Sequence, residues 1–232
     1  MKGTFERCES VPDAFSELVC EEITDDTTTL FLSGGDLAAE CYRALAARHV
    51  TGVGPEPDWS SLDIYYGDER CVPLDDEASN HRLVATNLLE VVGPVRSDHP
   101  MYRSGPPPDA ADAYQREIAP LPDFGLVHLG LGPDGHTASL FPESDALDVD
   151  DPGRYVVANS DPLGNNPHDR ITLTFAGIAR ARLVVFTVTG AEKHDALARI
   201  LAGEDLPAGR VDAPEIRWLV DSEAAGSLDL PR

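Results

Sequence analysis

Short apolar runs alternate along this chain with segments that have the spacing of helices. The clearest strand signal is the run LVVFTVT at 183–189, which ends at Gly190. Further strands are expected at 28–33, 62–66, 124–131, 154–158, 171–174 and 216–220, and helices at 36–48, 80–92, 110–118 and 191–201. This alternation predicts an α/β fold with a mostly parallel sheet covered by helices on both faces. With no repeat or linker in view, we expect one domain over residues 1–232.

Acidic residues greatly outnumber basic ones. The chain has 41 Asp and Glu residues against 18 Lys and Arg residues, so its formal net charge is −23. Such a surface repels nucleic-acid phosphates and anionic lipid, which argues against both as partners. The pattern is typical of a salt-adapted protein or a GC-rich coding background. Since Lys2 and Lys193 are the only lysines, Lys193 draws interest as a local cation.

Cysteine usage and apolar runs bear on the compartment. Four cysteines are present and none forms a C-x-x-C pair, so the sequence predicts neither a zinc nor a redox motif. The first fifteen residues contain no apolar run of the signal-peptide kind. The longest strongly apolar stretch, 183–188, is far shorter than the ~20 residues of a membrane-spanning helix. We therefore expect a cytoplasmic protein with reduced thiols.

The junctions that follow strands are where a site is expected, because ligands of open parallel sheets bind beyond the carboxyl ends of the strands. The first junction is SGGD at 33–36. Gly34 and Gly35 let the backbone approach a ligand, and the start of the next helix offers free N–H groups to a phosphate. The same residues also fit a tight turn in which Asp36 is the helix N-cap.

The second junction is GDER at 67–70, directly after the strand LDIYY. Arg70 can pair with a phosphate or another oxyanion, and Asp68 and Glu69 are placed to hold its guanidinium. An ordinary ion pair on the surface is the alternative.

The third junction is GLGPDGHT at 130–137. It matches the dinucleotide pattern G-x-G-x-x-G, but we reject that interpretation because Pro142 is expected to end the following helix after about two turns. What remains is a glycine-rich loop that presents Asp134 and His136. Histidine is suited to general base catalysis near neutral pH, and Asp134 can orient it. A structural histidine is the alternative.

The fourth junction is GAEK at 190–193, where Lys193 adds an ammonium group at a helix start. Arg170 opens the segment DRITLT and supplies another cation. Together Arg70, Arg170 and Lys193 suggest a phosphate ligand. A base without a nucleophilic Ser or Cys nearby, and without metal-ligand spacing, points to water as the nucleophile.

Four segments, taken together, resemble the 6-phosphogluconolactonase family. They are GDERCVP with the following SNHRLVATNLL, FGLVHLGLGPDGHTASLFPES, DRITLT and VTGAEKHDAL. The resemblance extends from about residue 28 to residue 211. It implies a three-layer α/β/α fold similar to glucosamine-6-phosphate deaminase and ribose-5-phosphate isomerase. It also implies hydrolysis of 6-phospho-D-glucono-1,5-lactone to 6-phosphogluconate in the oxidative pentose phosphate pathway, with no metal or organic cofactor.

The resemblance also assigns roles to residues. His136 would be the general base that activates water, with Asp134 beside it. Arg70 and Lys193 would bind the phosphate and offset charge that develops at the lactone carbonyl oxygen. The remaining substrate-binding residues that it implies, by position within the matching motifs, are Gly34, Gly35, Asp36, Asp68, Asn80, Gly135 and Arg170.

One departure from the family and two competing functions remain open. The family usually has a hydroxyl residue after the paired glycines, whereas Asp36 and Leu37 stand here, which removes donors and adds a negative charge. An amino-sugar phosphate deaminase or isomerase of the same fold is one alternative, although LFPE at 140–143 replaces the Phe-Asn-Glu-Pro stretch expected there. A sugar-phosphate sensor without turnover is the other. We expect a small phosphorylated substrate and a monomer or weak homo-oligomer.

Overall fold

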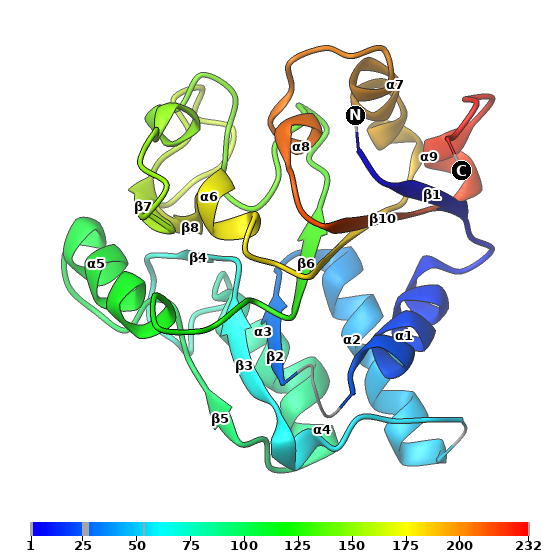
Figure 1. Cartoon of the computed structure of the whole chain (residues 1–232), viewed down its shortest axis with the longest axis horizontal. Coiled ribbons are helices and arrows are strands. Elements are labelled where there is room, and N and C mark those ends of the chain that lie inside the picture. Colours follow the sequence, from blue (N-terminus) through cyan, green and yellow to red (C-terminus); the bar gives the residue numbers. More distant parts are fainter. Residues whose placement is uncertain (1, 25–27, 53, 232) are drawn as a thin grey trace.

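The central feature of the fold is a seven-stranded sheet in which every neighbouring pair is parallel. The computed structural model describes residues 2–24, 28–52 and 54–231. In spatial order the strands are β1 (Thr4–Arg7), β10 (Glu215–Val220), β9 (Leu183–Val188), β6 (Leu126–Gly130), β2 (Thr29–Leu32), β3 (Asp63–Tyr66) and β5 (Ser97–Asp98). The predicted parallel sheet is therefore confirmed (Figure 1).

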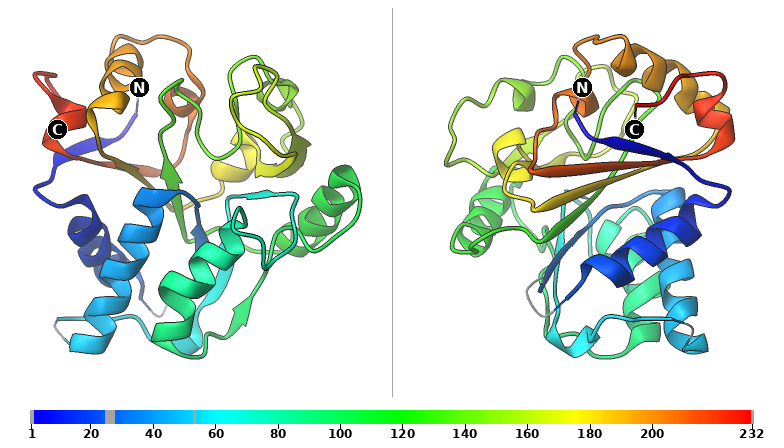
Figure 2. Two further views of the ribbon diagram at one scale, coloured as in Figure 1. Left: turned by 180° about the vertical axis from the view of Figure 1, so that it is seen from behind. Right: turned by 45° about the vertical axis from the view of Figure 1, so that its right-hand side comes forward.

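Helices cover this sheet on both sides (Figures 1 and 2). On one side lie α1 (Val11–Glu22), α2 (Asp36–Thr51) and the continuous helical segment made of α3 (Asn80–Val84), η2 (Ala85–Leu89) and α4 (Glu90–Val92). The other helical segments are η1 (Trp59–Ser61), α5 (Pro107–Ile118), η3 (Asp145–Asp148), α6 (Phe175–Ile178), η4 (Ala191–Lys193), α7 (His194–Leu201), α8 (Pro207–Arg210) and α9 (Ser222–Ala225). In the right-hand view of Figure 2, α7 and α8 lie across β9 and β10 from α1 and α2.

A second, antiparallel sheet stands beside the main one. It consists of β4 (Asp68–Arg70), β8 (Arg170–Leu173) and β7 (Val156–Asn159). The runs at 154–158 and 171–174 are strands as predicted, but they do not join the parallel sheet. The strand β4 was not predicted, because a three-residue polar segment carries no apolar period. This small sheet places Arg70 directly opposite Arg170.

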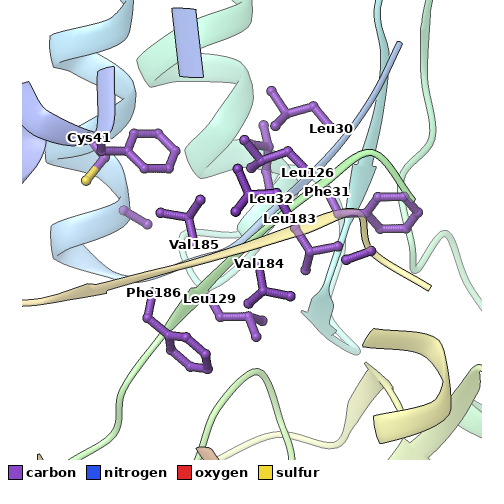
Figure 3. Close-up of a cluster of buried hydrophobic side chains, with 14 of the residues drawn as sticks. Leu30, Phe31, Leu32, Cys41, Leu126, Leu129, Leu183, Val184, Val185 and Phe186 are labelled. Carbon is purple, nitrogen blue, oxygen red and sulfur yellow. The ribbon is translucent and has the colours of Figure 1, made fainter. Parts of the chain in front are cut away.

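The central strands β9, β6, β2 and β3 of the main sheet are almost wholly buried because their side chains are mostly apolar on both faces. All six residues of β9 are buried, and Figure 3 shows Val185 on the α2 side, with Val184 and Phe186 pointing to the other side. Leu30 and Leu32 of β2 and Leu126 of β6 pack in the same cluster. This rigid centre fixes the positions of the loops that leave the strands.

The helices predicted at 80–92 and 191–201 form with local differences from the prediction, and one short predicted helix does not form. The predicted helix at 80–92 forms with the Ser79 hydroxyl accepting the N–H of Arg82, although its middle turn is a π-helix. The helix predicted at 191–201 instead opens with the 3-10 turn η4. The short helix expected before Pro142 is absent from the described chain, since residues 137–140 form an isolated bridge instead.

Candidate active site

Four strand-end loops meet at one edge of the main sheet. The strands β9, β6, β2 and β3 are neighbours, so their carboxyl ends bring together the junctions at 190–193, 130–137, 33–36 and 67–70. The prediction that these four segments converge is thus confirmed by the order of the strands.

Two adjoining cavities lie among these loops. The turn cavity, of about 310 Å³, is lined by Ser33, Gly34, Gly35, Asp36, Leu37, Ala38, Glu40, His128, Gly130, Leu131, Thr187, Val188, Thr189, Glu192 and Lys193. The histidine cavity, of about 200 Å³, is lined by Ser33, Gly34, Gly35, Asp68, Arg70, Asn80, Gly130, Leu131, Gly132, Pro133, His136, Ala138 and Lys193. The two cavities share the paired glycines and Lys193, and together they form one cleft.

The glycine turn at 33–36 depends on its sequence. Gly35 has φ of +98°, a conformation that residues with a Cβ rarely adopt. A Cβ on Gly34 would lie 1.8 Å from Oδ1 of Asn80. Gly35, and not Asp36, is the N-cap of α2, and no side chain caps this helix end. The interpretation of Asp36 as the N-cap is therefore wrong, and the first N–H groups of α2 remain available at the cleft.

The loop at 130–137 presents an Asp–His pair. Nδ1 of His136 lies 2.6 Å from Oδ1 of Asp134, and the same oxygen accepts the backbone N–H of His136. Burial alone would raise the pKa of Asp134, but the hydrogen bond and charge of His136 outweigh it and hold that pKa below its usual range. An ionised Asp134 selects the Nδ1–H tautomer, which leaves Nε2 of His136 as the basic nitrogen.

The carboxylates of the GDER segment bind neutral donors rather than Arg70. Glu69 accepts the backbone N–H groups of Arg70, Asn80 and His81 and the hydroxyl of Ser79. Asp68 accepts Nδ2 of Asn80 at 3.2 Å and the hydroxyl of Ser139 at 2.6 Å. The expectation that Asp68 and Glu69 pair with the Arg70 guanidinium is therefore wrong.

The guanidinium of Arg70 is held by a carbonyl instead. Its Nη1 donates to the Ala78 carbonyl oxygen at 2.6 Å, and it lines the histidine cavity together with His136. Within the described ranges, no ion pair involves Arg70, Arg170 or Lys193. These cations are therefore not neutralised by a carboxylate at close range.

Three of the predicted site residues lie near the cleft without lining it. Arg170 is 5% exposed, donates to the His168 carbonyl oxygen and is absent from both lining sets. Burial lowers the pKa of its guanidinium, and the adjacent Arg70 adds to that effect. Asp134 lines neither cavity and contacts His136. Gly135 packs against Leu206 and accepts the N–H of Ala208 at its carbonyl oxygen.

Sequence reasoning missed several residues of this site. Ser139 belongs to the loop that carries His136, yet its hydrogen bond to Asp68 has no sequence signal. His128 and Thr187 line the turn cavity from the interior of β6 and β9. A polar residue inside an otherwise apolar strand is the signal that could have identified both.

The described chain has no group of three or more His, Cys, Asp or Glu side chains placed to hold a metal ion. None of its described helices combines the length and the apolar character that a bilayer span requires.

Comparison with known proteins gives a consistent result. The family model for glucosamine-6-phosphate isomerases and 6-phosphogluconolactonase matches residues 6–219. A 6-phosphogluconolactonase of Synechocystis is 38% identical over 215 residues, which cover 86% of this chain and 84% of that protein. The crystal structure of the 6-phosphogluconolactonase of Thermotoga maritima is similar with a TM-score of 0.82 and 29% identity, over 95% of this chain and 100% of that one.

A monomeric glucosamine-6-phosphate deaminase shares the fold. Its structure is similar with a TM-score of 0.80 and covers 99% of this chain and 100% of its own, at 19% sequence identity. The three-layer fold expected from the resemblance is thereby confirmed.

Proposed function

The chain belongs to the family of glucosamine-6-phosphate isomerases and 6-phosphogluconolactonases, and on that premise we propose that it hydrolyses 6-phospho-D-glucono-1,5-lactone to 6-phosphogluconate. The observation that carries this proposal is the shared wall of the two cavities. Lys193 and the paired glycines belong to both cavities, while His136 and Arg70 belong to the histidine cavity alone. One end of the cleft suits an anion and the other suits acid–base chemistry.

The phosphate would lie against the shared wall. There the uncapped start of α2 offers backbone N–H groups, and Lys193 supplies a full positive charge. The lactone ring would extend into the histidine cavity. Arg170 would act from behind Arg70, where it adds positive potential without direct contact.

In the chemical step, Nε2 of His136 accepts a proton from water as the water oxygen bonds to the lactone carbonyl carbon. The electron pair of the carbonyl bond moves to its oxygen, where Arg70 offsets the developing negative charge. Collapse of this intermediate breaks the bond between that carbon and the ring oxygen. The ring oxygen takes the proton back from the imidazolium, which Asp134 has stabilised at Nδ1.

The direct experiment measures lactone hydrolysis above the spontaneous rate. We expect His136→Ala to lower turnover by roughly 10²–10⁴-fold, the range for loss of a general base. His49→Ala is the matched control, because His49 pairs with Glu56 at the end of α2 and lines neither cavity. Activity of His136→Ala within a few-fold of the parent would show that another group activates water.

Two other outcomes would redirect the proposal. Release of ammonia from glucosamine 6-phosphate would assign the chain to the deaminase branch of the family. Binding of the phosphorylated lactone without acceleration of its hydrolysis would make the protein a sensor.

A further inference from the structure

A chain of buried hydrogen bonds runs beneath the turn cavity. The backbone N–H of Ser33 donates to Oη of Tyr42 at 2.7 Å, and Oη lies 3.0 Å from Nδ1 of His128. Nε2 of His128 lies 2.9 Å from Oγ1 of Thr187. These hydrogen bonds connect the glycine turn with the end of β9. Ser33, His128 and Thr187 all line the turn cavity.

The surroundings hold the imidazole of His128 in one place. His128 is fully buried, and its ring packs on Phe15 with a centroid separation of 4.3 Å. Thr187 lies two residues after Val185 in β9 and therefore faces the same side of the sheet, which Figure 3 shows to be the side of α2 and Cys41. Burial lowers the pKa of His128 to about 3, so its imidazole is neutral at neutral pH. A neutral imidazole carries one proton, on either Nδ1 or Nε2.

Because this proton can be on either nitrogen, the hydrogen bonds that link Tyr42, His128 and Thr187 can be arranged in two ways. In the first, Tyr42 donates to Nδ1 and the N–H at Nε2 donates to Thr187. The hydroxyl proton of Thr187 is then free for another acceptor, such as the neighbouring sulfur of Cys41 or an anion in the cavity.

In the second arrangement, the N–H at Nδ1 donates to Tyr42, which donates to the Ser33 carbonyl oxygen at 3.0 Å. Thr187 must then donate to Nε2, and it has no proton left for a ligand. The tautomer of His128 therefore decides whether Thr187 is a donor or only an acceptor toward the cavity.

We infer that His128 is a positioning residue that directs the hydroxyl proton of Thr187 into the turn cavity, where Thr187 donates to the phosphate of the substrate. The inference rests on the proposed function, because it adds a contact to the phosphate of that substrate. No hydroxyl residue follows the paired glycines of the turn, since Asp36 and Leu37 stand there. The carboxylates of Asp36, Glu40 and Glu192 also line the cavity, so a neutral donor at its floor offsets their repulsion.

Thr187→Val is the first test, because it removes the hydroxyl and keeps the volume and the strand preference. We expect KM for the phosphorylated lactone to rise roughly tenfold or more, the loss of a hydrogen bond to a charged group, with kcat nearly unchanged. KM for unphosphorylated gluconolactone should rise much less, and the KM of Thr187→Ser for the phosphorylated lactone should be close to that of the parent. Equal losses on both substrates, or no loss with Thr187→Val, would overturn the inference.

The path through His128 requires a second measurement. His128→Leu should raise KM for the same substrate, and the double variant with Thr187→Val should be no worse than the single variants, since both remove one donor. Additive losses would contradict a shared path.

Nitrogen-15 NMR of the imidazole in the parent protein tests the inference without any substitution. At saturating inorganic phosphate the ring proton should be on Nε2, and a ring proton on Nδ1 in the phosphate complex would refute the inference. This readout does not depend on turnover. A parent protein that fails to accelerate lactone hydrolysis would instead refute the proposed function.

Discussion

His128 should make this protein less stable in acid. Its imidazole is fully buried between Phe15 and Tyr42, and burial lowers its pKa from 6.5 to about 3. Between these two pH values the unfolded chain binds one proton that the folded chain does not. Stability from the neutral buried form is therefore fully present above pH 6.5 and is lost as the pH falls toward 3.

The size of the effect follows from the shift. Each pH unit within this window lowers the free energy of unfolding by about 1.4 kcal/mol, so a drop from pH 6.5 to pH 5 removes about 2 kcal/mol. The variant His128→Leu has no proton to bind at this position. Its stability relative to the parent should improve by about 2 kcal/mol between neutral pH and pH 5.

Urea unfolding at fixed ionic strength, followed by the fluorescence of the buried Trp59 and Trp218, measures this difference. Every other titrating group is common to both proteins and cancels in the comparison. Thr187→Val is the control, since it removes the hydrogen bond at Nε2 and keeps the imidazole, and its pH dependence should follow that of the parent. Parallel stability curves for the parent and His128→Leu from pH 7 to pH 5 would refute the reasoning.

Two further substitutions probe the cleft. Lys193→Ala should lower kcat/KM for the phosphorylated lactone at least tenfold more than for gluconolactone, because Lys193 lines the turn cavity. Lys2→Ala is the control and should have no effect on either substrate, since Lys2 forms an exposed ion pair with Asp212. Equal losses on both lactones would place Lys193 away from the phosphate. Gly34→Ala should lower the free energy of unfolding by about 1–3 kcal/mol and impair activity, because its Cβ would lie 1.8 Å from Oδ1 of the buried Asn80. Gly153→Ala, where the nearest atom is 3.4 Å away, is the matched control, and equal stabilities of the two variants would contradict the argument.

The sequence predicts the five inner strands of the main sheet because they are largely buried, whereas the edge strands β1 and β5 are more exposed and were not predicted. Runs such as 183–189 are apolar throughout, and a glycine after the run marks where the strand ends. The sequence of a strand does not indicate which other strands it pairs with. The run at 171–174 is a strand as predicted, yet it pairs with β4 and β7 outside the parallel sheet.

The first helix was overlooked although its pattern is legible. Ser10 caps α1 by accepting the N–H of Asp13, and Val11, Phe15 and Val19 recur with helical spacing on its buried side. Here the local chemistry was sufficient to predict the element.

The structure brings predicted residues of the four loops together in one cleft, whereas the residues that line the cleft from inside the strands were missed. Gly34, Arg70, His136 and Lys193 follow strand ends, where the topology of a parallel sheet brings ligand-binding residues together. Thr187 lies inside β9, and its hydroxyl contacts His128 of β6. The sequence around Thr187 does not reveal such a contact with another element.

The acidic excess of the chain explains why the cleft also depends on neutral side chains. With 41 acidic residues and 18 basic ones, carboxylates are at hand to neutralise the cations of the site. Asp68 and Glu69 adjoin Arg70 in sequence. The Asp68 carboxylate, however, accepts hydrogen bonds from Asn80 and Ser139. The Glu69 carboxylate accepts them from backbone N–H groups and from Ser79. Because these acceptors are occupied by neutral donors, the positive charge of Arg70 remains directed at the cleft, where an anionic substrate can use it.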